Sequence, residues 1–201
     1  MSSRYKPATD KSRIITIDLA KRNSDKTVKR KCHCVTIEGQ DYQECKNATF
    51  WSSSKSSDNY DEKTPFPDGT GDVKVATGLF GETATAILFD LEVDLGYREK
   101  GDDCDFLVDD EKWDVKTAMK KGIRPNIMAK RSPIAKYVPM KDRYIVGFIQ
   151  NHDLVGQTVE VVMVGYFNRE DVEFEELFSS KKYPKISNYD VYFSESKPLV
   201  K

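Results

Sequence analysis

Three charged residues with the spacing Asp105-x8-Asp114-x-Lys116 have the chemistry to hydrolyse a phosphodiester bond. That reaction needs a hard cation, carboxylates to hold it, and a group that positions water or neutralises developing charge. Asp114 and Lys116 are two residues apart, so on a strand both side chains project from one face, about 7 Å apart. A short turn would bring Asp105 back toward Asp114 from the neighbouring strand. The spacing therefore predicts two carboxylates that share Mg²⁺ or Mn²⁺, with Lys116 beside them.

The tripeptide Asp114-Val115-Lys116 is uninformative by itself, because an acid two residues before a lysine recurs elsewhere in the chain. The surroundings set this copy apart. Apolar residues flank it in a strand pattern, a short apolar run led by Asp105 precedes it, and Glu82 lies upstream in a helical pattern. The context, rather than the tripeptide, carries the prediction of a catalytic group.

Hydrophobic periodicity and turn signals predict the elements that position these residues. We expect a helix from residue 72 to about 93, interrupted or capped near Gly78 and Gly81. A hairpin should follow, with strands at 106–108 and 113–119 around a turn at 109–112. The other expected elements are strands at 13–17, 34–37, 144–150, 158–164 and 189–193, an exposed loop at 52–71, and a helix from 168–171 to Phe174, Leu177 and Phe178. This order predicts an α/β or α+β fold with a mixed central β-sheet flanked by helices.

A chain of 201 residues is long enough for one good-sized domain. The Ser-, Asp- and Pro-rich stretch 52–71 suggests a β-rich N-terminal extension over residues 1–71 and a core over residues 72–201, within one compact domain overall. The first residues lack the apolar segment of a signal peptide, and no apolar run approaches the roughly 18 residues of a membrane span. We therefore expect a cytoplasmic protein with no membrane partner.

The formal net charge of −1 hides a segregation of charge along the chain. Residues 1–35 carry ten Lys and Arg against three Asp, and residues 82–114 carry twelve acids against three bases. Residues 115–143 then carry nine bases against Asp142 alone. An acidic block followed by a basic one predicts a cation site beside an anion-binding surface.

The basic segment after the motif is suited to following a nucleic-acid backbone. Gly122, Pro125 and Pro133 make it a loop. Its candidate phosphate contacts are Lys120, Lys121, Arg124, Lys130 and Arg131. Such contacts give affinity and salt dependence rather than sequence readout.

Together, GETA (81–84) and DCDFLVDDEKWDVKTA (103–118) resemble the PD-(D/E)XK nuclease superfamily, which has the restriction-endonuclease-like fold. The stretch is particularly similar to small phage and viral members and to archaeal Holliday-junction resolvases. VEVVMVGYFNREDV (159–172) is also similar to a strand and short helix of such phage proteins. The resemblance covers roughly residues 72–195.

The resemblance implies a role for each residue of the motif. Asp105 and Asp114 would be the two metal-binding acids, with Lys116 as the lysine and the Val115 carbonyl as a further ligand. Glu82 would be the helix glutamate that completes the metal shell. The chain departs from the pattern in two ways, because no proline precedes the first acid and the second acid is Asp rather than Glu.

The neighbouring acid leaves one assignment open. Asp103 lies two residues before Asp105 and is an alternative first acid. Cys104 occupies the place before Asp105 where the pattern has proline.

The expected activity is that of a Mg²⁺- or Mn²⁺-dependent DNA endonuclease, acting on double-stranded or branched DNA as a homodimer. If the chain is encoded by a phage or virus, the expected location is the host-cell cytoplasm. Two alternatives remain: a catalytically weak or inactive nuclease-fold protein that binds nucleic acid or another protein, and a junction-specific or RNA-directed nuclease.

Cys32, His33, Cys34 and Cys45 are zinc-ligand residue types, but they lack C-x2-C spacing. On a strand, His33 would also face away from both neighbouring cysteines. We therefore favour reduced, partly buried thiols over a zinc site.

Two polar residues near residue 150 are weaker candidates. His152 is interpreted as part of a turn after a strand rather than as a general base. Gln150 would lie at the end of a strand that flanks the site, in contact with its ligands. The chain contains no P-loop, dinucleotide fingerprint or nucleophile elbow.

Overall fold

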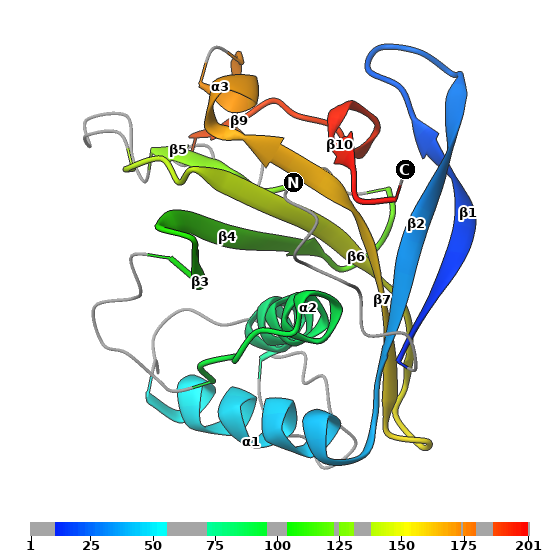
Figure 1. The fold of residues 1–201 in the computed structure, drawn as a ribbon, viewed down its shortest axis with the longest axis vertical. Helices are drawn as coiled ribbons and strands as arrows, with labels where there is room; N and C mark the ends of the chain where they lie inside the picture. The colour runs from blue at the N-terminus through cyan, green and yellow to red at the C-terminus, as the bar shows by residue number, and fades with distance from the viewer. Residues whose placement is uncertain are drawn as a thin grey trace.

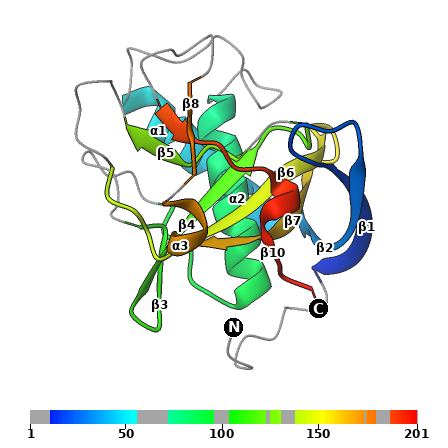
Figure 2. The ribbon, with the colours of Figure 1, turned by 90° about the horizontal axis from the view of Figure 1, so that it is seen from above.

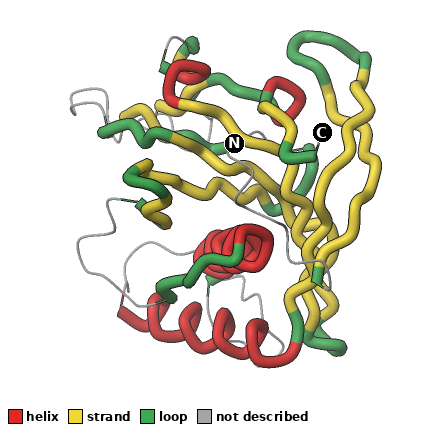
Figure 3. Tube along the Cα trace, viewed as in Figure 1, coloured by secondary structure: helices red, strands yellow, loops and turns green. Residues whose placement is uncertain are grey.

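The computed structural model describes residues 11–55, 72–95, 104–122, 125–130, 138–173, 175–179 and 187–200. In chain order, the elements are β1 (Ser12–Ala20), β2 (Thr27–Ile37), α1 (Gly39–Lys55), α2 (Val73–Phe89), β3 (Phe106–Val108), β4 (Glu111–Ala118), β5 (Met128–Lys130), β6 (Arg143–Asp153), β7 (Thr158–Asn168), α3 (Arg169–Val172), β8 (Leu177–Phe178), β9 (Ser187–Tyr189), a 3-10 turn η1 (Phe193–Glu195) and β10 (Lys197–Pro198). Figure 1 shows their arrangement, and Figure 3 separates helix from strand along the trace.

A mixed sheet of seven strands forms the centre of the described fold. Its order is β1-β2-β7-β6-β4-β3, and the short β10 pairs with β7. The neighbours are antiparallel except β4 and β6, which run parallel and so need a crossover between them. This arrangement confirms the expected α+β class with a mixed central sheet flanked by helices.

The central strands β6 and β7 confirm two of the predicted strands and extend beyond them. Both carry continuous buried runs, because helices and loops cover the sheet on both faces. β6 continues to Asp153, so Gln150 and His152 lie within the strand. The predicted turn at His152 is therefore wrong. The His152 Nε2 lies 3.1 Å from the Tyr42 hydroxyl oxygen, and its ring packs on Phe80.

The N-terminal strands belong to this same sheet. β1 and β2 contain the two strands predicted at 13–17 and 34–37; both are longer than expected, and they pair as an antiparallel hairpin that the sequence did not predict. β2 then pairs with β7 from His33, opposite Met163, to Ile37, opposite Val159. The strands of residues 1–71 and those of residues 72–201 are thus joined by backbone hydrogen bonds.

Two helices cover one face of the sheet. Figure 1 shows α2 between the sheet and α1, and Figure 2 shows α2 running across the strands. α1 was not predicted, and it includes Ser52 to Lys55 of the predicted loop 52–71; the rest of that loop lies outside the described residues. Its buried residues Tyr42, Cys45 and Thr49 repeat at helical spacing, although serines close the helix. No described helix is long and apolar enough to cross a bilayer.

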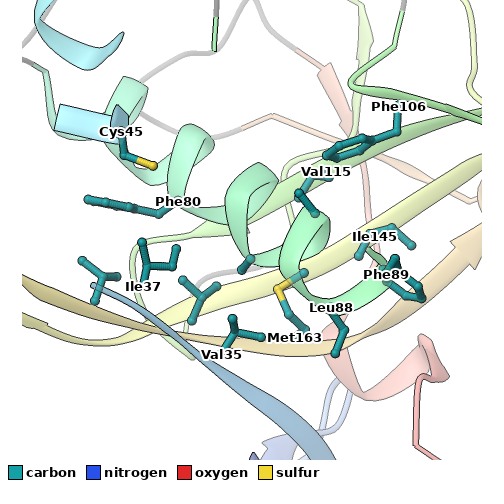
Figure 4. Packing of buried hydrophobic residues seen from close by; sticks show 14 of the residues in the cluster. Val35, Ile37, Cys45, Phe80, Leu88, Phe89, Phe106, Val115, Ile145 and Met163 are labelled. Carbon is teal, nitrogen blue, oxygen red and sulfur yellow. The ribbon is translucent and has the colours of Figure 1, made fainter. Parts of the chain in front are cut away.

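α2 is one continuous helix, so the predicted interruption near Gly78 and Gly81 is wrong. The Asp72 carboxylate caps it by accepting from the backbone N–H of Lys74 (2.7 Å) and Val75 (3.2 Å). Its buried face includes residues spaced four apart, which pack on the sheet: Ala76, Phe80, Ala84 and Leu88. Figure 4 shows Phe80 and Leu88 among the side chains of β2 and β7. This burial outweighs the cost of about 1 kcal/mol for each glycine inside a helix.

A second apolar cluster fills the other face, beneath the small sheet β5-β9-β8 and α3. α3 ends at Val172, and Leu177 and Phe178 form the exposed strand β8, so the predicted helix through these two residues is wrong. Phe174 lies outside the described residues. The predicted strand 189–193 is likewise replaced, because β9 ends at Tyr189 and Phe193 opens a 3-10 turn.

Candidate active site

The β3–β4 hairpin confirms the predicted strands and brings Asp105 next to β4. β3 pairs with β4 only from Phe106 to Val108, and the Asp105 N–H donates to the Trp113 carbonyl at 3.0 Å. β3 begins only at Phe106, and just before it the Asp105 side chain takes the place that an earlier strand residue would occupy beside β4. Its Oδ2 accepts the backbone N–H of Val115 at 2.6 Å. Since the N–H and C=O of a strand residue point to the same edge, the Val115 carbonyl also faces this edge.

The side chains of β4 alternate as the sequence predicts. Trp113 and Val115 are buried in the core on the α2 side. Asp114 and Lys116 project from the opposite face, with exposed side-chain fractions of 13% and 28%. The Lys116 Nζ lies 2.5 Å from the Asp114 Oδ2. The two groups therefore form a largely buried ion pair beside Asp105.

The approach of α2 to β4 depends on Gly81. A Cβ atom there would overlap Thr117 Oγ1 and would lie 2.8 Å from Thr117 Cβ and 3.3 Å from Val115 Cγ1. Only glycine allows the helix backbone to come so close to the strand. The next residue, Glu82, is thereby held near the edge of β4. Close packing against β4 therefore explains why a glycine, Gly81, precedes Glu82 in the sequence.

These groups line one cavity of about 510 Å³. Acidic groups come from Glu82 of α2, Asp105 and Asp114, and lysines come from Lys74, Lys116 and Lys141. The remaining lining residues are Thr77, Gly78, Val115, Thr117, Met119, Asn126, Met128, Val138, Pro139 and Tyr144. The cavity thus includes residues of α2, of β4 and of the chain that leads into β6.

Burial and charge shift the pKa values of Asp105 and Lys116. The pKa of Asp105 is raised to about 6, first by burial and then by the negative charge of Asp114. Lys116 and the Val115 N–H oppose this rise, because both favour the ionised carboxylate. For Lys116, burial lowers the pKa, but Asp114 and Asp105, with Glu82, raise it above its ordinary value. The lysine is therefore a fixed positive charge.

The acid pair fits a hard divalent cation. Asp105 and Asp114 are oxygen donors held side by side, and a cation would offset both the burial and the repulsion that raise the Asp105 pKa. The Val115 carbonyl faces the same edge. Glu82 lines the cavity, but among the described residues no three carboxylate, His or Cys side chains gather at metal-ligand spacing. Mg²⁺ or Mn²⁺ would thus have two aspartates as its nearest protein ligands, with Glu82 farther away.

The predicted nucleic-acid contacts are only partly described. Lys120 and Lys121 are exposed in the turn after β4. Lys130 ends β5. Arg124 and Arg131 lie outside the described residues, as does Asp103, the alternative first acid.

Sequence reasoning missed Tyr144, which faces the site from β6. It lies opposite Asp114 in the parallel pairing of β4 and β6, so the two side chains share a face. The Tyr144 hydroxyl accepts the backbone N–H of Lys141 at 3.1 Å. Burial first, and then the Asp114 charge, raise the pKa of Tyr144. No sequence signal gives the register of a parallel pair. Gln150, in contrast, is exposed on β6 and does not line the cavity, so its predicted supporting role is wrong.

Three of the four cysteines lie apart from this site, in two groups. Cys32 and Cys34 are buried in the second apolar cluster, and His33 between them faces the other side of β2. Cys45 is buried in α1, where its thiol lies 3.0 Å from the Thr83 hydroxyl. Burial raises the pKa of Cys32 to about 11 and of Cys45 to about 12. These are the unreactive, buried thiols that the sequence favours.

Comparison of the chain with protein-family models, curated proteins and solved structures finds no match.

Proposed function

We propose that this protein is a Mg²⁺- or Mn²⁺-dependent DNA endonuclease with a restriction-endonuclease-like core. The observation that carries the proposal is the meeting of Asp105, Asp114 and Lys116 at the free end of β4. The order of α2, the β3–β4 hairpin and the parallel β6 supports the same core. Carboxylates that hold a hard cation beside a fixed ammonium group are the chemistry that phosphodiester hydrolysis needs.

Each residue has a role in that hydrolysis. A bound Mg²⁺ or Mn²⁺ would stabilise negative charge on a phosphate oxygen and make a bound water more acidic. Asp105 and Asp114 would hold the cation, with the Val115 carbonyl on the same edge and Glu82 supporting from α2. Lys116 is fixed against Asp114. It would orient the attacking water and offset the charge that develops as water attacks phosphorus in line with the leaving oxygen.

A binding module without cleavage is the second candidate. It is favoured by the ion pair in which Lys116 already neutralises Asp114. The lack of a third carboxylate at metal-ligand spacing among the described residues also favours it. Such a protein would bind nucleic acid and use these charges for stability alone.

Cleavage of a substrate panel distinguishes the two. Linear, supercoiled, branched and single-stranded DNA, together with RNA, would be incubated with Mg²⁺, Mn²⁺ or EDTA. Asp114→Asn is compared with Asp110→Asn, because Asp110 is exposed in the turn of the same hairpin and has a left-handed φ of 66° that asparagine tolerates. Calorimetry of Mg²⁺ and Mn²⁺ binding is measured on the same proteins.

The nuclease proposal expects metal-dependent cutting and metal binding that Asp114→Asn abolishes and Asp110→Asn retains. Preference for branched DNA or for RNA would assign the junction-specific or RNA-directed class. If the wild-type protein binds neither metal and cuts no substrate, the enzyme proposal is wrong. Cutting both strands of DNA calls for two sites, so we propose a homodimer, which sedimentation velocity would detect.

A further inference from the structure

α2 contains two glycines, Gly78 and Gly81, and close packing against a neighbouring strand requires glycine at only one of them. Gly81 is required by the close approach to Thr117. At Gly78, in contrast, a Cβ atom would meet only the Glu82 Oε1 among the described residues, at 3.9 Å. Glycine is less favourable than alanine inside a helix. Gly78 thus weakens α2, and no contact among the described residues calls for it.

The position of Gly78 on the cavity wall offers a reason. It lies between Lys74 and Glu82 along α2, and all three line the cavity. A side chain at this position would stand in the cavity above the Glu82 carboxylate. The missing side chain therefore keeps the space beside the acids open.

Lysines occupy both walls around this space. Lys74 lies in the first turn of α2, next to the Asp72 cap, and lines the cavity from this helix. Lys141 lies on the opposite wall, in the segment that leads into β6, and its backbone N–H is fixed by the Tyr144 hydroxyl. A nucleic-acid backbone that approaches three carboxylates needs positive charge on either side of them.

We propose that a nucleic-acid backbone crosses the cavity over Gly78, with Lys74 and Lys141 contacting phosphates on either side of the reacting one. This inference rests on the proposed nuclease function. Gly78 supplies clearance for the strand, and the two lysines act as point charges for its phosphates. The path adds contacts on α2 and before β6 to the basic loop that follows β4.

Measurements of DNA binding and of thermal stability distinguish two roles for Gly78, which are to leave space for the nucleic acid or to allow close packing of α2. The probe is a short fluorescein-labelled DNA duplex, followed by anisotropy with Ca²⁺ in place of Mg²⁺ over a series of salt concentrations. The variants are Gly78→Ala, Gly78→Leu, Lys74→Ala and Lys141→Ala. Lys29→Ala is the matched control, because Lys29 is 79% exposed on β2, with β7 and β6 between its strand and β4.

Each cavity lysine variant should weaken binding by on the order of tenfold and lower the slope of log K against log salt by about 0.9. Gly78→Leu should weaken binding with little change in that slope. Gly78→Ala should raise the melting temperature by about 2–4 °C, because alanine favours the helix. Higher stability of Gly78→Ala together with weaker DNA binding by Gly78→Leu would show that Gly78 is needed to leave room for the strand and not for packing.

Three results would overturn the inference: normal binding by Gly78→Leu, an equal effect of Lys29→Ala, or a lower melting temperature for Gly78→Ala. If the wild-type protein cuts DNA and the cavity variants bind it normally, the inference alone fails. If the wild-type protein neither binds nor cuts nucleic acid, the proposed function fails with it.

Discussion

Replacing Asp105 by asparagine should stabilise the metal-free protein, and increasingly so as pH rises. The pKa of Asp105 rises from 3.8 in the unfolded chain to about 6 in the fold. Between these values the folded state binds more protons than the unfolded state, so the contribution of Asp105 to stability falls as pH increases. A difference of about two pH units corresponds to at most about 3 kcal/mol. Asparagine carries no charge and keeps the acceptor for the Val115 N–H. The unfolding free energy of the variant therefore does not fall with pH through this position.

The assay is urea unfolding of wild-type protein and Asp105→Asn in EDTA at several values between pH 4 and pH 8. The measured quantity is the difference in unfolding free energy between the two proteins, because contributions of other titrating groups cancel in it. It should increase by up to about 3 kcal/mol from pH 4 to pH 7 and then level off. Asp18→Asn, at a half-exposed position on β1, controls for the loss of one negative charge.

A metal titration completes the test. Mg²⁺ should stabilise the wild-type protein at pH 7 and stabilise Asp105→Asn much less, because ligands that bind only the folded state raise its stability. If the free-energy difference between the two proteins is independent of pH, burial and the Asp114 charge do not raise the pKa of Asp105 in the folded protein. The reasoning that joins this acid pair to a cation would then be refuted.

Three further changes test other parts of the site. Gly81→Ala should cost about 1–3 kcal/mol in urea unfolding, because the new methyl group overlaps Thr117; unchanged stability would contradict the close approach. Lys116→Met should abolish cleavage and lower stability in EDTA at pH 8 by about 1–3 kcal/mol, since Asp114 loses its counter-ion, and an active variant would remove the lysine from the mechanism. Iodoacetamide at pH 8, with mass spectrometry, should alkylate the partly exposed Cys104 ahead of the three buried thiols, whose pKa values burial raises; early labelling of any buried thiol would contradict their packing.

The features that the sequence predicted are those encoded by local apolar patterns. The β4 strand alternates apolar and polar residues, whereas β6 and β7 show short continuous apolar runs, and polar residues mark the turns. Asp114 and Lys116 lie two residues apart on a strand, and this separation alone predicts that their side chains share a face. These predictions hold because neighbouring residues determine them.

The features that it missed depend on contacts between distant segments. α1 is held by a narrow buried stripe against α2, and its serine-rich end suggested a loop. α2 passes through Gly78 and Gly81 because packing on the sheet outweighs helix propensity. The place of Tyr144 beside Asp114 comes from parallel pairing across a long crossover, which leaves no periodic signal in the chain.

The late start of β3 explains why the acid pair lies where it does. If β3 began two residues earlier, at Cys104, its backbone would pair with Val115, and no polar edge would remain open to a ligand. Instead the Asp105 carboxylate accepts that N–H and stays within reach of Asp114. One side chain therefore satisfies the backbone of an unpaired edge and supplies an oxygen donor there. A cation bound at this edge would be held by the end of a strand rather than by a mobile loop, which gives the orientation that in-line hydrolysis requires.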